Sequence, residues 1–175
     1  MGVYANYKAA PPEVVASYLD DFDGLDELCE APGGPCRTFS LHKAWRVVWC
    51  TLEPEAFDAV VLPEREPSAP AGILGAAVVG ARPLNPEHSL KRGEEFVGVH
   101  YHTRVLTAEE VQAAWKALEA LTELDIERAY DSGTVTKTFG PHVVPAADLY
   151  GTVGTLRDFY REVAAEGMVV TVMIG

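Results

Sequence analysis

The sequence predicts an α+β fold, in which a small mixed or antiparallel sheet packs against several amphipathic helices. Several segments carry apolar residues at the 3.6-residue period of a helix. Short runs with strand character stand between them, and the chain ends on an apolar run over residues 168–174. The length of 175 residues suits one hydrophobic core, so we expect a single compact domain over residues 1–175.

The first part of the chain is expected to hold a strand, a helix and a loop. Residues 3–7 resemble a short edge strand. Two prolines then stand where the first turn of a helix tolerates them, and apolar positions at helical spacing extend this helix over about 12–21. After a glycine, a shorter helical turn is expected over 25–29. The proline- and glycine-rich residues 31–38 are predicted to form a loop.

A helix that contains two tryptophans is expected to begin at Leu41, with Ser40 as its N-cap. Its apolar positions share one stripe, which comprises Leu41, Ala44, Trp45, Val48, Trp49 and Leu52. The continuous apolar run 73–79 contains a glycine and is short for a helix. We interpret it as a strand buried on both faces. Residues 57–62 fit either a strand or a short helix.

The region after the polar residues 83–94 begins with a predicted strand. Residues 96–103 alternate in the manner of a strand. Thr107 and Glu110 form the sequence pattern of a capping box, which predicts the start of an amphipathic helix. A further helix is expected over 122–130.

The C-terminal region is predicted to end in a helix and a strand. Residues 134–147 are expected to be irregular or extended. From residue 148 to 166 the apolar positions follow the helical period, and Gly167 provides a stop. The run 168–174 is rich in β-branched residues and has almost no polar side, so it should be an interior strand.

Composition and charge disfavour two classes of partner. Fourteen Lys and Arg against 26 Asp and Glu give a net charge of −12, which opposes the phosphate contacts that dominate nucleic-acid binding. No run approaches the roughly 18 to 20 apolar residues of a membrane span, and the N-terminus lacks the pattern of a signal peptide. We therefore expect a cytoplasmic protein, with neither nucleic acid nor a membrane as its partner.

The three cysteines, Cys29, Cys36 and Cys50, show no CxxC spacing. Neither a disulfide framework nor a thiolate zinc site is indicated, so reduced thiols are the expected state. Cys29 and Cys36 flank the short loop and are able to meet across it, which leaves a cysteine pair as the second interpretation.

Five blocks of sequence together resemble one known family. They are MGVYANYKAAPPEVVASYLDD, HKAWRVVWCTL, GILGAAVVGARPL, LTAEEVQAAWKALEAL and LRDFYREVAAEGMVVTVMIG. In this order, and over nearly the whole chain, they resemble the YfbM-like family of bacterial proteins, the domain of unknown function 1877. The first is similar to that family's opening Met-Gly, Asn-Tyr and acidic helix, the second to its Lys-Ala-Trp helix, the third to its apolar strand, the fourth to its capped middle helix and the fifth to its ending. The resemblance implies a compact α+β domain without established chemistry.

A metal site is one candidate for chemistry. His100 and His102 lie two residues apart, which on a strand places both imidazoles on one face, as two ligands of zinc or iron require. No spacing selects a third ligand, so a solvated strand face is the favoured interpretation and no cofactor is expected. There is no G-x-S-x-G elbow either, and the chain is interpreted as a binding protein more readily than as an enzyme.

Two hypotheses for function follow. The favoured one is a non-enzymatic acidic protein that binds a basic partner protein, as an immunity or antitoxin-like factor does. The alternative is a small enzyme or ligand-binding domain with a pocket near five polar and aromatic residues, with or without a metal at the histidine pair. The pocket candidates are Tyr4, Asn6, Tyr7, Lys43 and Trp45.

An acidic segment over residues 20–30 is the candidate surface for the first hypothesis. It holds six acids and no base. Unpaired carboxylates cost several kcal/mol each to bury, so these side chains should face outward and attract a basic partner. The candidate partner-facing residues are Asp20, Asp21, Asp23 and Asp26.

Overall fold

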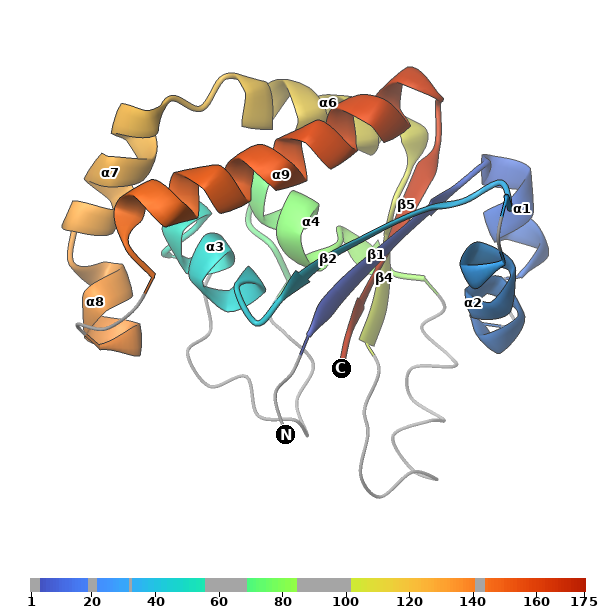
Figure 1. Cartoon of the computed structure of the whole chain (residues 1–175), viewed down its shortest axis with the longest axis horizontal. Coiled ribbons are helices and arrows are strands. Elements are labelled where there is room, and N and C mark those ends of the chain that lie inside the picture. Colours follow the sequence, from blue (N-terminus) through green and yellow to red (C-terminus); the bar gives the residue numbers. More distant parts are fainter. Residues whose placement is uncertain (1–3, 19–21, 32, 56–68, 85–101, 141–143) are drawn as a thin grey trace.

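A five-stranded antiparallel sheet lies at the centre of the molecule (Figure 1). The computed structural model describes residues 4–18, 22–31, 33–55, 69–84, 102–140 and 144–175. The strands lie in the order β2-β1-β5-β4-β3. Their bounds are Ala5–Ala10 for β1, Arg37–His42 for β2, Arg82–Pro83 for β3, His102–Leu106 for β4 and Val169–Ile174 for β5. β5 pairs with both β1 and β4, which confirms the predicted interior C-terminal strand.

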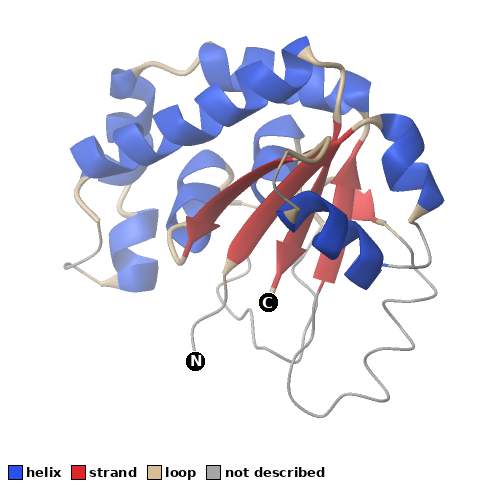
Figure 2. Cartoon of the chain, turned by 45° about the vertical axis from the view of Figure 1, so that its right-hand side comes forward, coloured by secondary structure: helices blue, strands red, loops and turns tan. Residues whose placement is uncertain are grey.

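Helices lie on both faces of the sheet, and most of them cover one face (Figures 1 and 2). This inner face carries α3 (Trp45–Leu52), α4 (Ile73–Val79), α6 (Ala108–Glu119) and α9 (Ala146–Ala165), which α7 (Glu123–Asp131) and α8 (Thr134–Phe139) extend. The opposite, outer face carries α1 (Pro12–Ser17) and α2 (Phe22–Glu30). The predicted α+β class is confirmed. None of the described helices is long and apolar enough to cross a membrane.

The apolar run at residues 73–79 forms helix α4, so its prediction as a strand is wrong. Residues Gly75 to Val79 are all buried, and the run has no polar side that would reveal its period. An apolar run of this length suits a buried helix as well as a buried strand, and only the surrounding elements decide between them. The helix ends at Gly80, whose φ of 79° favours glycine.

The prediction of a helix from Leu41 with Ser40 as its N-cap is also wrong, as is the loop assigned to residues 37 and 38. Residues 37–42 form β2, and α3 begins only at Trp45. The Ser40 hydroxyl donates to the Ala5 carbonyl at 3.2 Å and accepts from the His42 amide at 3.1 Å. It serves the β1–β2 ladder, because pairing across the sheet outweighs the local capping signal.

Other expectations meet mixed outcomes. The Thr107 capping box is confirmed, since its hydroxyl accepts from the Glu110 amide and the Glu110 carboxylate accepts from the Thr107 amide. Part of the region predicted to be irregular, over 134–147, is helical: α8 follows Gly133. Residues 57–62 and 96–101 lie outside the described residues.

Two of the cysteines are joined, which corrects the expectation of reduced thiols. Cys29 in the last turn of α2 forms a disulfide with Cys36, directly before β2, with their Cα atoms 5.0 Å apart. Cys50 on α3 is free and buried. Spacing along the chain did not favour this pair over reduced thiols, because the bond depends on how the loop returns from α2 to the sheet.

Two buried tyrosines complete the hydrogen bonding at the end of α4. The Tyr7 hydroxyl, from β1, donates to the Val78 carbonyl at 2.7 Å. The Tyr160 hydroxyl, from α9, donates to the Ala77 carbonyl at 3.0 Å. The last carbonyls of a helix have no partner within the helix, so the tyrosines satisfy acceptors that burial would otherwise leave unpaired.

We expect Tyr7→Phe and Tyr160→Phe each to lower the free energy of unfolding by about 1–3 kcal/mol, because each leaves a buried carbonyl without its donor. Urea denaturation measures this loss. Tyr4→Phe is the matched control: Tyr4 is 38% exposed, and its loss of a hydroxyl should change stability by less than about 0.5 kcal/mol. Equal losses in all three variants would contradict the role assigned to the buried pair.

Stability should also fall above pH 10. Burial raises the pKa of both Tyr7 and Tyr160 above the value in the unfolded chain. The unfolded chain then loses protons that the folded protein keeps, so each tyrosine reduces stability by up to about 1.4 kcal/mol per pH unit above about pH 10. Urea midpoints between pH 8 and 11 should show this decline, flattened in the double variant Tyr7→Phe/Tyr160→Phe.

Candidate functional site

The outer face of the sheet is apolar at one end and polar at the other. Ala10, Val105 and Val169 form a small cluster with Val15 of α1, which covers that end. Beyond the cluster the outward positions of β1 are Asn6 and Lys8, because side chains alternate between the two faces of a strand. A polar half of the sheet face is thus left beside α2.

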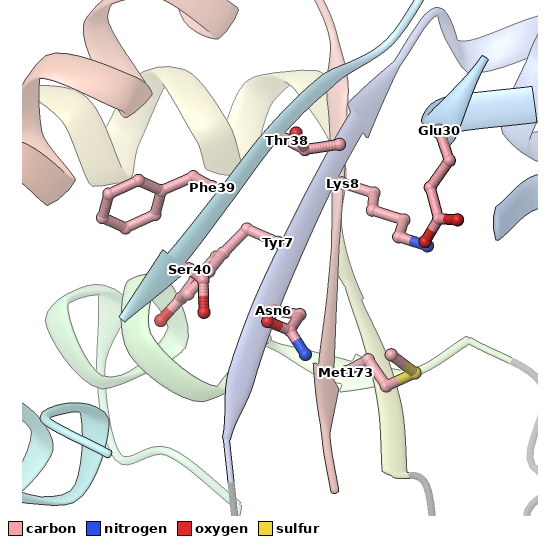
Figure 3. A pocket seen from close by; sticks show the side chains of 8 residues that line it. All are labelled: Asn6, Tyr7, Lys8, Glu30, Thr38, Phe39, Ser40 and Met173. Carbon is pink, nitrogen blue, oxygen red and sulfur yellow. The ribbon is translucent and has the colours of Figure 1, made fainter. Parts of the chain in front are cut away.

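A groove with a volume of about 440 Å³ lies on this polar half (Figure 3). We call it the outer groove; its side chains come from β1, β2, β5 and the end of α2, and they are Asn6, Lys8, Glu30, Thr38, Ser40 and Met173. Tyr7 and Phe39 also border it, although their side chains join the core on the inner face. The groove therefore presents amide, hydroxyl, ammonium, carboxylate and thioether groups.

The outer groove contains one acidic and one basic side chain that differ in exposure. The Lys8 side chain is only 11% exposed, and its Nζ lies 3.9 Å from Glu30 Oε1. The Glu30 side chain is 77% exposed. A pair this open contributes little stability, about 0–1 kcal/mol. Its effect is on the surface: the carboxylate faces solvent at the rim, and the ammonium lies beneath it.

A second cluster lies where β2 ends. The Ser40 hydroxyl that borders the groove is 3.4 Å from His42 Nδ1. The His42 ring meets the edge of Tyr4, with 6.2 Å between centroids, and Lys43 Nζ is 5.8 Å from the Tyr4 ring centroid. His42 has a φ of 46°, where the pairing of β1 with β2 is irregular. We call His42 and Lys43 the basic end of the groove.

The five residues predicted to line one pocket divide between three places. Asn6 borders the outer groove, and Tyr4 and Lys43 lie at its basic end. Tyr7 and Trp45 are fully buried on the other side of the sheet, where Trp45 stacks on Trp49. The structure brings Asn6 together with Lys8 and Ser40 instead. Asn6 is on the predicted strand 3–7, but Lys8 lies beyond its predicted end; the two share a face because β1 continues to Ala10.

The acidic and histidine candidates are only partly described. Asp20, Asp21 and His100 lie outside the described residues. Asp23 and Asp26 belong to α2 and His102 to β4, and their side chains are not among the described ones. The neighbouring Glu27 and Glu30 are exposed. Within the described part of the chain, no three His, Cys, Asp or Glu side chains are grouped so that they could hold a metal ion.

Comparison with known proteins decides the family. Residues 1–173 match the family model of the domain of unknown function DUF1877. The chain belongs to the DUF1877 family. This match confirms the resemblance that the sequence blocks of this DUF1877 chain indicated. No curated protein matches it.

A solved structure shares the fold. This DUF1877 chain is similar to YfbM from Escherichia coli, a protein of unknown function, with a TM-score of 0.65 and 16% sequence identity. The alignment covers 98% of this chain and 99% of YfbM. At 16% identity the similarity establishes a common architecture. The chemistry of the groove has to be argued from the residues that line it.

Proposed function

We propose that this DUF1877 protein is a binding module that holds a basic segment of a partner protein in the outer groove. The observation that carries this proposal is the exposed carboxylate of Glu30 at the rim of a polar groove, with the Lys8 ammonium buried beneath it. A molecule that approaches the groove meets negative charge first. The net charge of −12 adds a long-range field of the same sign, which favours encounter with a basic partner.

The groove suits an extended peptide segment. The Asn6 amide and the Thr38 hydroxyl supply both donors and acceptors, which a peptide backbone requires. Met173 adds a flexible apolar surface that adapts to different side chains. The volume of the outer groove, about 440 Å³, is in the range found for ligand pockets in proteins.

The charges at the groove also favour one orientation of the segment. Glu27 and Glu30 at the end of α2 are exposed acids, whereas His42 and Lys43 form the basic end. A partner segment should therefore place its Lys or Arg residues beside α2. In this proposal Asp20, Asp21, Asp23 and Asp26, which precede these acids in the sequence, also contribute to the attraction of a basic partner. The protein then works in the cytoplasm, in a role such as that of an immunity or antitoxin-like factor.

A second candidate is a small anionic ligand, because the Lys8 ammonium borders the groove. In that case the ligand would displace Glu30 and pair with Lys8. The two candidates require opposite charges on the ligand, and this difference makes them separable by experiment.

Binding of a short lysine-rich peptide, followed by NMR chemical shifts, tests the proposal. Saturable shifts are expected at Asn6, Thr38 and Ser40. The double variant Glu27→Gln/Glu30→Gln should weaken binding roughly threefold to tenfold, because two exposed charges contribute modestly. Glu119→Gln/Glu127→Gln removes the same charge from exposed positions of α6 and α7 and should bind as the wild type does. Equal weakening in both variants would show that only net charge matters.

Lys8→Met discriminates between the two candidates. Methionine keeps a flexible aliphatic side chain and removes the ammonium that faces Glu30. Binding of the lysine-rich peptide should strengthen, because Glu30 loses its internal counter-charge. A matching glutamate-rich peptide should bind neither protein. If the glutamate-rich peptide binds the wild type and Lys8→Met abolishes this binding, the anionic-ligand candidate replaces the first.

A further inference from the structure

We infer that the partner segment binds as an added antiparallel strand along the outer edge of β2, the edge that faces away from β1. The partner is an extended segment with an apolar residue opposite Phe39 and a basic residue opposite Thr38. That the segment is basic rests on the proposed function, whereas its pairing with β2 rests on the backbone geometry of the sheet.

β2 is the end strand of the sheet. Within the residues that the structure describes, β2 pairs with β1 on one side and with no strand on the other. Thr38 is exposed and Ser40 is half-buried. Arg37 and His42, the two residues of β2 that can carry a charge, lie at its ends. Charged side chains protect sheet edges from pairing, so the uncharged middle of β2 is the part open to another strand.

The hydrogen bonds of β1 identify the backbone groups that β2 uses inside the sheet. Tyr4, directly before β1, and Gly175, directly after β5, exchange both of their backbone hydrogen bonds, at 2.7 and 3.1 Å. Backbone groups point alternately to the two neighbours of a strand, so Tyr7 directs its amide and carbonyl to β2. Its partner there is Phe39. The backbone groups of Phe39 are therefore used within the sheet.

Thr38 and Ser40, on either side of Phe39, direct their amides and carbonyls away from β1 by the same alternation. A residue placed opposite either of them on an antiparallel strand exchanges two hydrogen bonds with it. The side chains of Thr38 and Ser40 also border the outer groove (Figure 3). The segment's side chains opposite these two residues lie on the same face of the sheet, so they stand at the rim of the groove.

The inner face sets the residue between these two positions. Phe39 is half-buried and stacks on Phe159, with 5.3 Å between the ring centroids. The segment's residue opposite Phe39 lies on this inner face, beside the part of the ring that remains accessible. A β-branched apolar side chain suits this position, because aromatic and β-branched residues pair favourably across strands.

Charges set the residues on the outer face. Thr38 lies opposite Lys8 in the sheet, and Glu30 Oε1 lies 3.9 Å from Lys8 Nζ. The exposed carboxylate of Glu30 is therefore at the Thr38 end of the groove, which favours Lys or Arg on the segment there. The basic end of the groove lies at the other end of β2, where the segment should carry an acid.

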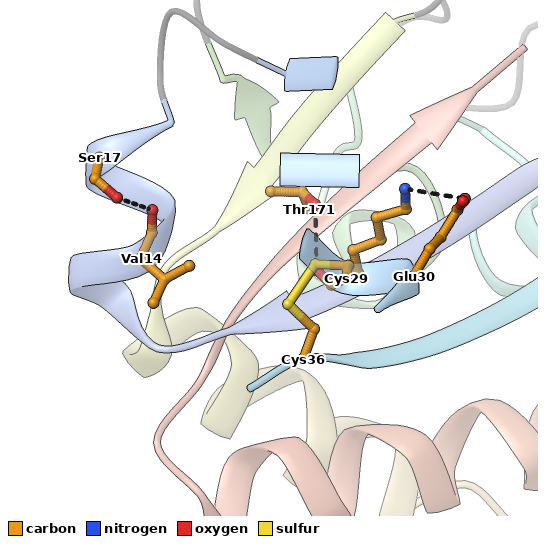
Figure 4. Close-up of a disulfide and its surroundings, with 7 residues drawn as sticks. Val14, Ser17, Cys29, Glu30, Cys36 and Thr171 are labelled. Carbon is orange, nitrogen blue, oxygen red and sulfur yellow. Dashed lines mark hydrogen bonds and ion pairs between the residues drawn. A yellow bond between two sulfur atoms is a disulfide. The ribbon is translucent and has the colours of Figure 1, made fainter. Parts of the chain in front are cut away.

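The edge of β2 suits a short segment better than a second copy of this chain. Cys36, directly before β2, is bonded to Cys29 (Figure 4), and the other end of the strand leads into the turn before α3. An edge that is held at both ends loses little conformational freedom on binding. Two copies, each with a net charge of −12, would repel each other. Two six-residue edges are also short for the roughly 1,200–2,000 Å² of a stable interface.

Amide hydrogen exchange, followed by NMR on the wild-type protein, tests the geometry directly. In the free protein the amides of Thr38 and Ser40 should exchange about a hundredfold faster than that of Phe39, which alone donates within the sheet. Saturation with the peptide acetyl-Glu-Val-Thr-Val-Lys-Lys-amide should slow both at least about tenfold. Equal protection of the three amides in the free protein overturns the inference. If dilution releases that protection, the occupant is a second copy.

Two N-methylated forms of this peptide separate strand pairing from binding in the groove alone. In the expected pairing the peptide's Thr lies opposite Ser40 and its second Val opposite Phe39. N-methylation of the Thr removes an N–H that donates to β2 and should weaken binding at least about tenfold. N-methylation of the second Val, whose N–H points to solvent, should change binding by less than about threefold. Equal effects of the two methyl groups overturn the inference.

Thr38→Pro and Thr38→Ala are the matched variants of the protein. Proline removes the outward amide and is tolerated on edge strands, so binding should weaken at least about tenfold, whereas alanine keeps this amide and should cost less than about threefold. Cooperative urea unfolding verifies that both variants are folded, and equal weakening by the two counts against strand pairing. Sensitivity to N-methylation without an effect of Glu27→Gln/Glu30→Gln would remove the proposed charge recognition and leave the pairing. The reverse result would remove only the pairing.

Discussion

The hydrogen bonds at the end of α4 constrain the rest of the molecule. A short helix enclosed by other elements has carbonyls that neither water nor its own backbone satisfies. The hydroxyls of Tyr7 and Tyr160 supply the missing donors to Val78 and Ala77. One tyrosine belongs to the sheet and the other to the long helix α9. The position of α4 therefore fixes β1 and α9 relative to each other.

The exit from α4 adds a second constraint. At Gly80 a β-carbon would overlap with Arg104 of β4, so the backbone of this turn lies directly against the sheet. At the other end of the helix, the Glu53 carboxylate accepts from the Ala71 amide at 3.1 Å and occupies the space that a side chain at Gly75 would need. Both glycines allow α4 to lie closer to its neighbours than any larger residue would.

The outer groove is a consequence of this core. Tyr7 must point inward to reach Val78, and the pleat of β1 then turns Asn6 and Lys8 outward. The end of α2 completes the groove with Glu30, and the Cys29–Cys36 bond links that end to the start of β2. The inward direction of Tyr7 thus decides which groups of β1 form the site.

Local patterns in the sequence determined the elements that carry their own signals. The capping box at Thr107 marks the start of α6 because its two hydrogen bonds join residues three apart. The β-branched run at the C-terminus indicates an interior strand because it has almost no polar side. Periodicity also indicates α9. Each signal lies within one continuous segment of the chain, so it does not depend on distant contacts.

Only the tertiary structure decided the remaining features. The run that forms α4 has no polar side, so its sequence does not distinguish helix from strand, and in the fold two distant tyrosines donate to its last carbonyls. Tyr7 and Asn6 are adjacent in the chain yet face opposite layers, which separates residues that the sequence grouped into one pocket. The partnership of Lys8 with Glu30 and that of Cys29 with Cys36 depend on the return of the chain from α2 to the sheet. These contacts form between segments that the fold brings together, and local sequence patterns do not specify them.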